Sequence, residues 1–144
     1  MEKRGRKTGR EIFLRGVAEM RVMVVDDQVG IRALLAEVVK QQDFQVVLAG
    51  NAREAIAKFS EDPPDMILLD DKLPGMSGLE LLRKIRETHP HLPVVLMTAY
   101  GERDIEEEAK RLGVHAFLAK PFDIEHLKEL LDRFRGDASS NSLL

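Results

Sequence analysis

The 144-residue chain contains no cysteine, which excludes a disulfide framework and any thiolate metal or redox site. No apolar run approaches the roughly 18 residues of a membrane span, so we expect no membrane association. The N-terminal residues lack the apolar core of a secretory signal peptide, which predicts a cytoplasmic protein. The four histidines include no pair with the spacing of a metal site on one helix, and we assign them no chemistry.

The net charge of −3 is spread unevenly along the chain. Residues 1–20 carry +3 and the rest carries −6, so the body is acidic, which argues against nucleic acid as a partner. We expect residues 1–20 to form a flexible basic extension, with Met20 as an alternative start. Residues 136–144 are rich in Gly, Ser and Asn, and we expect a disordered tail there. One domain without internal repeats, residues 21–135, lies between them.

Short apolar runs alternate five times with amphipathic stretches in this domain. The runs predict strands at residues 21–25, 44–48, 65–69, 94–97 and 115–119. Helices are expected at residues 29–41, from 51 onward, 78–88, 102–112 and from 123 onward, and two starts carry capping pairs, Asn51 with Glu54 and Ser77 with Glu80. This alternation predicts an α/β fold with a parallel sheet covered by helices on both faces.

Four of the five runs end on residue types that serve phosphate or metal chemistry. These residues are Asp26, Asp27, Asp70, Thr98 and Lys120. In open α/β sheets the carboxyl ends of the strands line the edge where ligands bind. We therefore expect three carboxylates, a hydroxyl and an ammonium to converge on one small site.

Such a site suits phosphoryl transfer. Asp70 can attack phosphorus and form an acyl phosphate, but Asp26 and Asp27 would repel it unless a cation lay among them. Oxygen ligands with few protein contacts favour Mg²⁺. Lys120 and Thr98 can then hold phosphate oxygens, since positioning and charge stabilisation carry the reaction.

Each residue alone has a simpler interpretation. Two aspartates after a strand often form a turn or begin a helix, and Thr98 can satisfy backbone groups at a strand end. Lys120 can be ordinary surface charge. The occurrence of all of them at strand ends, in order, favours the common site.

Five segments around these residues resemble the receiver domain of two-component response regulators: Val-Val-Asp-Asp-Gln (24–28), Ile-Leu-Leu-Asp (67–70), Leu-Pro-Gly-Met-Ser-Gly (73–78), Met-Thr-Ala-Tyr-Gly (97–101) and Ala-Lys-Pro-Phe-Asp (119–123). The resemblance implies a flavodoxin-like (βα)5 doubly wound sheet of strand order 2-1-3-4-5. It also implies a phosphoacceptor signalling protein rather than an enzyme, one that assists its own phosphorylation and dephosphorylation.

The resemblance assigns roles residue by residue. Asp70 would be the phosphoacceptor, and Mg²⁺, or Mn²⁺ or Ca²⁺ in its place, would be held by Asp26, Asp27, Asp70 and the Lys72 backbone carbonyl, with Asp26 acting through water. Thr98 would be the switch hydroxyl and Phe117 the switch aromatic residue. Lys120 would bind phosphate and join Pro121 through a cis peptide bond.

Within this family, the chain resembles the single-domain receivers of sporulation phosphorelays in three segments: Asp-Asp-Gln-Val-Gly-Ile-Arg (26–32), Met-Thr-Ala-Tyr-Gly-Glu (97–102) and Lys-Pro-Phe-Asp-Ile (120–124). This implies a stand-alone regulator, a monomer or weak dimer, that receives phosphate from a sensor histidine kinase and acts on a protein partner or a histidine phosphotransferase. The implied partner surface contains Gln28, Gly30, Ile31, Leu34, Tyr100, Pro121 and Phe122. Ile31 and Leu34 can instead face the core. Tyr100 can instead anchor its loop, although the resemblance implies that it screens the acceptor and tunes dephosphorylation.

Two departures from the family pattern occur. Asp71 stands where the family usually has an apolar residue, and alternation along the strand predicts that it points outward. Ser77 replaces an aspartate, which preserves the helix cap.

Other classes fit less well. A haloacid-dehalogenase-like phosphatase would need Asp-x-Asp where this chain has Asp26-Asp27-Gln28, and a flavin-binding module would need a Ser/Thr-rich loop there. A pseudo-receiver would lack one of the site residues. A receiver within a longer regulator remains an alternative to the stand-alone form.

Overall fold

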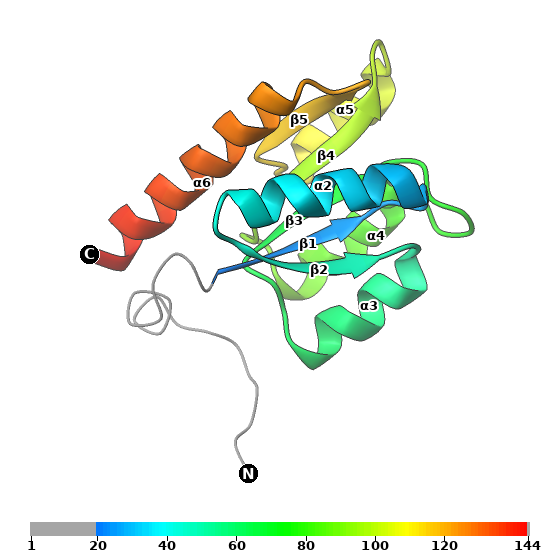
Figure 1. Cartoon of the computed structure of the whole chain (residues 1–144). Helices are drawn as coiled ribbons and strands as arrows, with labels where there is room; N and C mark the ends of the chain where they lie inside the picture. The colour runs from blue at the N-terminus through cyan, green and yellow to red at the C-terminus, as the bar shows by residue number, and fades with distance from the viewer. Residues whose placement is uncertain (1–19, 144) are drawn as a thin grey trace.

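The computed structural model describes residues 20–143, so the basic extension predicted for residues 1–20 lies, except for Met20, outside the described residues. Five strands alternate with five helices (Figure 1). The strands are β1 (Arg21–Val25), β2 (Gln45–Ala49), β3 (Met66–Asp70), β4 (Val94–Ala99) and β5 (Ala116–Lys120). The helices are α2 (Val29–Gln41), α3 (Ala52–Glu61), α4 (Gly78–Thr88), α5 (Arg103–Arg111) and α6 (Ile124–Leu143).

All strand pairs are parallel, and the sheet has the order β2-β1-β3-β4-β5, which confirms the predicted topology. The register aligns the carboxyl ends of the strands. Val25 pairs with Leu69 across β1 and β3, and Asp70 pairs with Met97 across β3 and β4. Residues that follow β1 and end β3 therefore meet at one edge of the sheet.

Alternating side chains of the central strands build two cores, one on each face of the sheet. Val22 and Val24 pack with residues of α2 and α6, whereas Met23 and Val25 pack with residues of α3, α4 and α5. Figure 1 shows α2 and α6 over one face and α3 and α4 over the other. Because β3 lies between β1 and β4, every residue of this strand is buried.

Side-chain hydrogen bonds begin three of the helices, and two of these are the predicted capping pairs. The Asn51 side chain accepts a hydrogen bond from the Glu54 amide, and Ser77 with Glu80 forms a complete capping box. Asp123 accepts a hydrogen bond from the Glu125 amide at the start of α6. Within the described part of the chain, no helix combines the length and apolar character needed to cross a bilayer.

The last helix differs from the prediction, because α6 continues through Leu143 where a disordered tail was expected from residue 136. One glycine costs a helix only about 1 kcal/mol relative to alanine. No proline follows Gly136, so nothing in the sequence forces the helix to end there.

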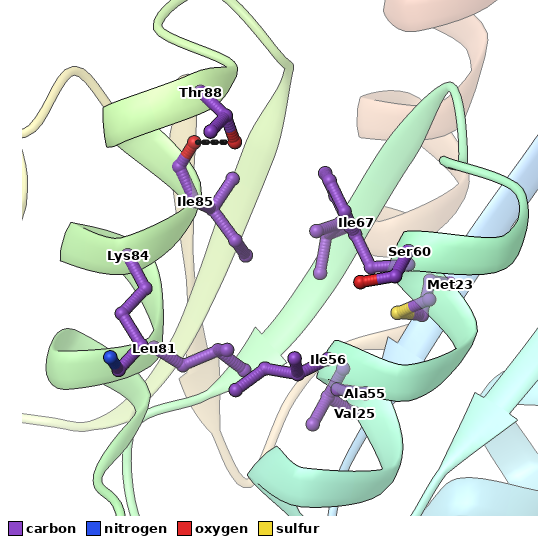
Figure 2. Close-up of a pocket in the computed structure, with 11 residues that line it drawn as sticks. Met23, Val25, Ala55, Ile56, Ser60, Ile67, Leu81, Lys84, Ile85 and Thr88 are labelled. Carbon is purple, nitrogen blue, oxygen red and sulfur yellow. Dashed lines mark hydrogen bonds between the residues drawn. The ribbon is translucent and has the colours of Figure 1, made fainter. Parts of the chain in front are cut away.

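A small apolar cavity lies between α3 and α4, with Ile56, Ile67, Leu81 and Ile85 among its walls (Figure 2). Its volume is about 210 Å³. Sites for small molecules typically measure about 300–1,000 Å³. None of the site residues predicted from the sequence lines this cavity, so we interpret it as a packing gap between the two helices.

Candidate functional site

Three aspartates converge at the carboxyl edge of the sheet. Asp26 and Asp27 directly follow β1, and Asp70 ends the neighbouring strand β3. One carboxylate oxygen from each lies within 4.8 Å of the others. Asp26 and Asp70 are buried, whereas Asp27 is exposed to solvent. The predicted gathering of carboxylates is therefore present, with one open side.

Lys120 reaches this cluster from the end of β5. Its Nζ lies 2.9 Å from Oδ2 of Asp26 and 3.2 Å from Oδ2 of Asp70. Burial lowers the pKa of Lys120, but the hydrogen bond to Asp26 and the charge of Asp70 outweigh that effect and raise it. The peptide bond between Lys120 and Pro121 is cis, as the resemblance implies. Lys120 thus supplies a fixed positive charge beside the two buried carboxylates.

Asp70 titrates far from its ordinary range. Burial and the charge of Asp26 raise the pKa of Asp70 from 3.8 to about 6, although Lys120 and the Lys72 amide partly offset both. A second positive charge among the carboxylates would favour the ionised form, which is the form that attacks phosphorus.

The three carboxylates fit a hard divalent cation. Mg²⁺ binds oxygen at about 2.0–2.1 Å, so ligands on opposite sides of the ion lie about 4.2 Å apart. The separation within 4.8 Å is compatible with that span. Asp26 Oδ1 accepts the Gln28 amide at 2.9 Å and Asp70 Oδ1 accepts the Lys72 amide at 3.3 Å, which orients both carboxylates. The cluster can therefore hold a metal ion, and the role of the Lys72 carbonyl stays a prediction.

Thr98 and Asp71 form a buried pair beside Asp70. Thr98 lies in β4 and is 2% exposed, and its Oγ1 donates to Oδ2 of Asp71 at 3.3 Å, with the Ala99 carbonyl 3.4 Å away. Burial raises the pKa of Asp71, and the hydrogen bond from Thr98 offsets part of the increase.

The prediction that Asp71 points outward is wrong, because only 6% of this residue is exposed. Alternation along a strand brings a side chain to solvent only where one face of the sheet is open. Here β3 is central and helices cover both faces, so the residue after Asp70 also enters the protein.

The predicted partner surface is largely accessible. Gln28, Gly30 and Pro121 are exposed, and Leu34 is 40% exposed. Ile31 and Phe122 are only partly buried and pack against the core on the α2 and α6 side. Leu34 is thus accessible to a partner, whereas Ile31 is partly exposed and also packs against the core; the partner roles of both residues stay predictions.

The sequence interpretation missed two exposed apolar residues near the same edge, Val29 (70% exposed) and Ile124 (37%). Each begins a helix next to a strand-end loop. Val29 falls outside the apolar stripe of Leu35, Val38 and Val39 that faces the core, and this mismatch was the available signal.

The two aromatic residues of the predicted switch lie in different environments. Phe117 is partly buried and packs against the core on the α3–α5 side. Tyr100 is 93% exposed and so covers little of the site in this conformation. Their roles in switching and in screening the acceptor stay predictions.

A doubly wound sheet with an acidic cluster, a lysine and a buried hydroxyl at its carboxyl edge defines a class of signalling domain. The family model of the response regulator receiver domain matches residues 22–132, and the chain belongs to this family. The sporulation initiation phosphotransferase F of Bacillus subtilis is 40% identical over 114 residues, which cover 79% of this chain and 92% of that protein.

Two further comparisons agree with this assignment. The chemotaxis protein CheY of Listeria monocytogenes is 34% identical over 79% of this chain and 97% of its own. The crystal structure of the receiver domain of NtrX from Brucella abortus superimposes with a TM-score of 0.75 at 33% identity, covering 80% of this chain and 98% of that domain. The flavodoxin-like receiver fold is thereby confirmed.

Proposed function

We propose that this protein accepts a phosphoryl group from the phosphohistidine of a sensor kinase onto Asp70, with Mg²⁺ as cofactor, in a two-component system or phosphorelay. One observation carries the proposal. Asp70 lies 3.2 Å from Lys120 and within reach of two further carboxylates, in a chain of the receiver family. Phosphotransfer from a histidine kinase takes place in the cytoplasm, which is the compartment that the proposal implies.

The reaction needs an ionised Asp70. A carboxylate oxygen of Asp70 forms the new bond to phosphorus while the N–P bond of the donor breaks. The imidazole leaves with the electron pair of that bond and takes up a proton from solvent. Lys120 then binds a phosphoryl oxygen as a fixed positive charge. Mg²⁺, held by Asp26, Asp27, Asp70 and the Lys72 carbonyl, would supply the remaining charge neutralisation.

The signal leaves the site through partner contacts. Phosphorylation draws the Thr98 hydroxyl toward the phosphoryl group and lets Phe117 turn inward, which reshapes the face formed by α5, β5 and α6. Gln28, Gly30 and Leu34, with Pro121 and Phe122, form the docking surface for the kinase or for a histidine phosphotransferase that receives the group next. The exposure of Leu34 supports this assignment.

Intact mass after incubation with acetyl phosphate and Mg²⁺ tests the proposal. We expect the wild type to gain one phosphate, and Asp70→Asn or chelation of Mg²⁺ to abolish the gain. Asp104→Asn, which changes an exposed aspartate of α5, is the matched control and should label as the wild type does. Absence of labelling with several donors, or labelling that survives in Asp70→Asn, would refute the proposed function.

A further inference from the structure

Asp71 carries a negative charge into the interior beside the phosphoacceptor. In the described residues, the acceptors available to the Thr98 hydroxyl are the Asp71 carboxylate at 3.3 Å and the Ala99 carbonyl at 3.4 Å. A hydroxyl has one hydrogen to donate, and a carboxylate is the stronger acceptor of the two. The Asp71 carboxylate therefore holds the Thr98 hydroxyl in this conformation.

The backbone of Asp71 is fixed from two sides. Its amide donates to the Met97 carbonyl at 3.0 Å, and its carbonyl accepts the Gly78 amide at 3.0 Å. The Asp71 Cα lies close to the start of α4, since a Cβ placed on Gly78 would come within 2.7 Å of it. These contacts hold the Asp71 main chain in place, so the hydrogen bond between Asp71 and Thr98 breaks through rotation of a side chain and not through displacement of the backbone.

Under the proposed function, this Thr98 hydroxyl donates its hydrogen bond to the phosphoryl group on Asp70. Because it has a single hydrogen, binding phosphate and binding Asp71 exclude each other. A negative charge at residue 71 also faces Glu102 and Lys72, whose own side chains form an ion pair of 3.2 Å. Lys72 is therefore shared with another carboxylate, and Lys120, whose charge also acts on Asp71, pairs with Asp26 and Asp70. Among the described residues, Thr98 is the side chain that donates a hydrogen bond to Asp71.

We propose that Asp71 is a positioning residue that retains the Thr98 hydroxyl in the unphosphorylated protein, so that the switch proceeds only when the phosphoryl group outcompetes this buried carboxylate. The inference rests on the proposed function. It implies that the chain resists spontaneous activation more strongly than a receiver with an apolar residue at this position.

The test measures the affinity for beryllofluoride, a phosphoryl mimic, by calorimetry at saturating Mg²⁺. Asp71→Leu removes the competing acceptor, and we expect affinity to rise by roughly tenfold, the effect of one hydrogen bond to a charged group. Asp71→Asn keeps a neutral acceptor that is weaker than the carboxylate, so its affinity should lie between those of the wild type and Asp71→Leu. In a Thr98→Ala background, Asp71→Leu should change nothing, because the hydroxyl through which it acts is gone.

Three outcomes would overturn the inference: an unchanged affinity in Asp71→Leu, an equal rise in the Thr98→Ala background, or Asp71→Asn matching Asp71→Leu. If Asp71→Leu does not fold, Asp71→Ala removes the acceptor without adding bulk and answers the same question. Failure of the proposed function is distinguishable, since the wild type itself would then neither bind the mimic nor label on Asp70.

Discussion

Burial and a neighbouring carboxylate both oppose the charge that Asp70 needs for the proposed reaction, and Lys120 offsets them only in part. The residue is 3% exposed, so solvent does little to relieve the conflict. A buried carboxylate of this kind lowers the free energy of unfolding, and replacing it with a neutral side chain should raise that free energy again. We therefore expect Asp70 to lower the stability of the fold whenever no cation is bound beside it.

Asp70→Asn should raise the free energy of unfolding at pH 7.5 in chelator by roughly 1–3 kcal/mol. The pKa of Asp70 is about 6 in the folded state against an ordinary 3.8, so the unfolded chain releases this proton first as pH rises. Wild-type stability should accordingly fall between about pH 4 and pH 6 relative to the variant. Urea unfolding at both ends of this window, with Asp104→Asn as control, measures the difference. A gap that does not depend on pH would contradict the explanation.

At the scale of elements, the start of α4 lies tightly against the end of β3 beside the site. A Cβ on Gly78 would lie 2.2 Å from the Asp70 carbonyl oxygen, so a side chain there must push α4 away from the strand end. We expect Gly78→Ala to destabilise the protein by about 1–3 kcal/mol and to slow labelling by acetyl phosphate. Gly136→Ala, which meets nothing within 4 Å, is the control and should be neutral or slightly stabilising. Equal stabilities for the two variants would contradict the tight contact.

A single arginine joins two turns at the opposite edge of the sheet. Arg86 of α4 donates to the carbonyls of Leu112 at 2.6 Å, His89 and Leu92 at 2.9 Å, and Gly113 at 3.0 Å. These bonds hold the end of α4 against the turns that lead into β4 and β5.

Arg86→Met keeps much of the side-chain length but removes all four hydrogen bonds, so we expect a loss of roughly 2–4 kcal/mol in unfolding free energy. Thermal or urea unfolding against Arg83→Ala, an exposed arginine of the same helix, measures it. A loss no larger than that of the control would show that water replaces these bonds.

Most elements and most of the site follow from local patterns together with topology. Asn51 and Ser77 mark helix starts within a few residues of chain, and parallel strands bring Asp26 and Asp70 together wherever the strand order is 2-1-3. The burial of Asp71 could not be read in this way, because it depends on what covers both faces of β3. The hydrogen bond from Thr98 to Asp71 could not be predicted either, because it depends on how deeply the two side chains lie in the folded protein.

At the scale of the whole molecule, three like charges at one edge should make stability depend on divalent cations. An ion that binds the folded cluster and not the unfolded chain would add about 1.4 kcal/mol to the unfolding free energy for each tenfold excess over its dissociation constant. We expect the midpoint of thermal unfolding to rise with Mg²⁺, and Asp27→Asn to remove most of the rise. An equal response in this variant would place the ion elsewhere.

The central claim concerns which of four neighbouring aspartates carries the phosphoryl group. Borohydride reduces an aspartyl phosphate to homoserine and so marks the position permanently. The wild type, phosphorylated with Mg²⁺ and acetyl phosphate and then reduced, should show homoserine at residue 70 in a peptide map by mass spectrometry. Homoserine at residue 26, 27 or 71, or none at any position, would contradict the assignment of Asp70 as the acceptor.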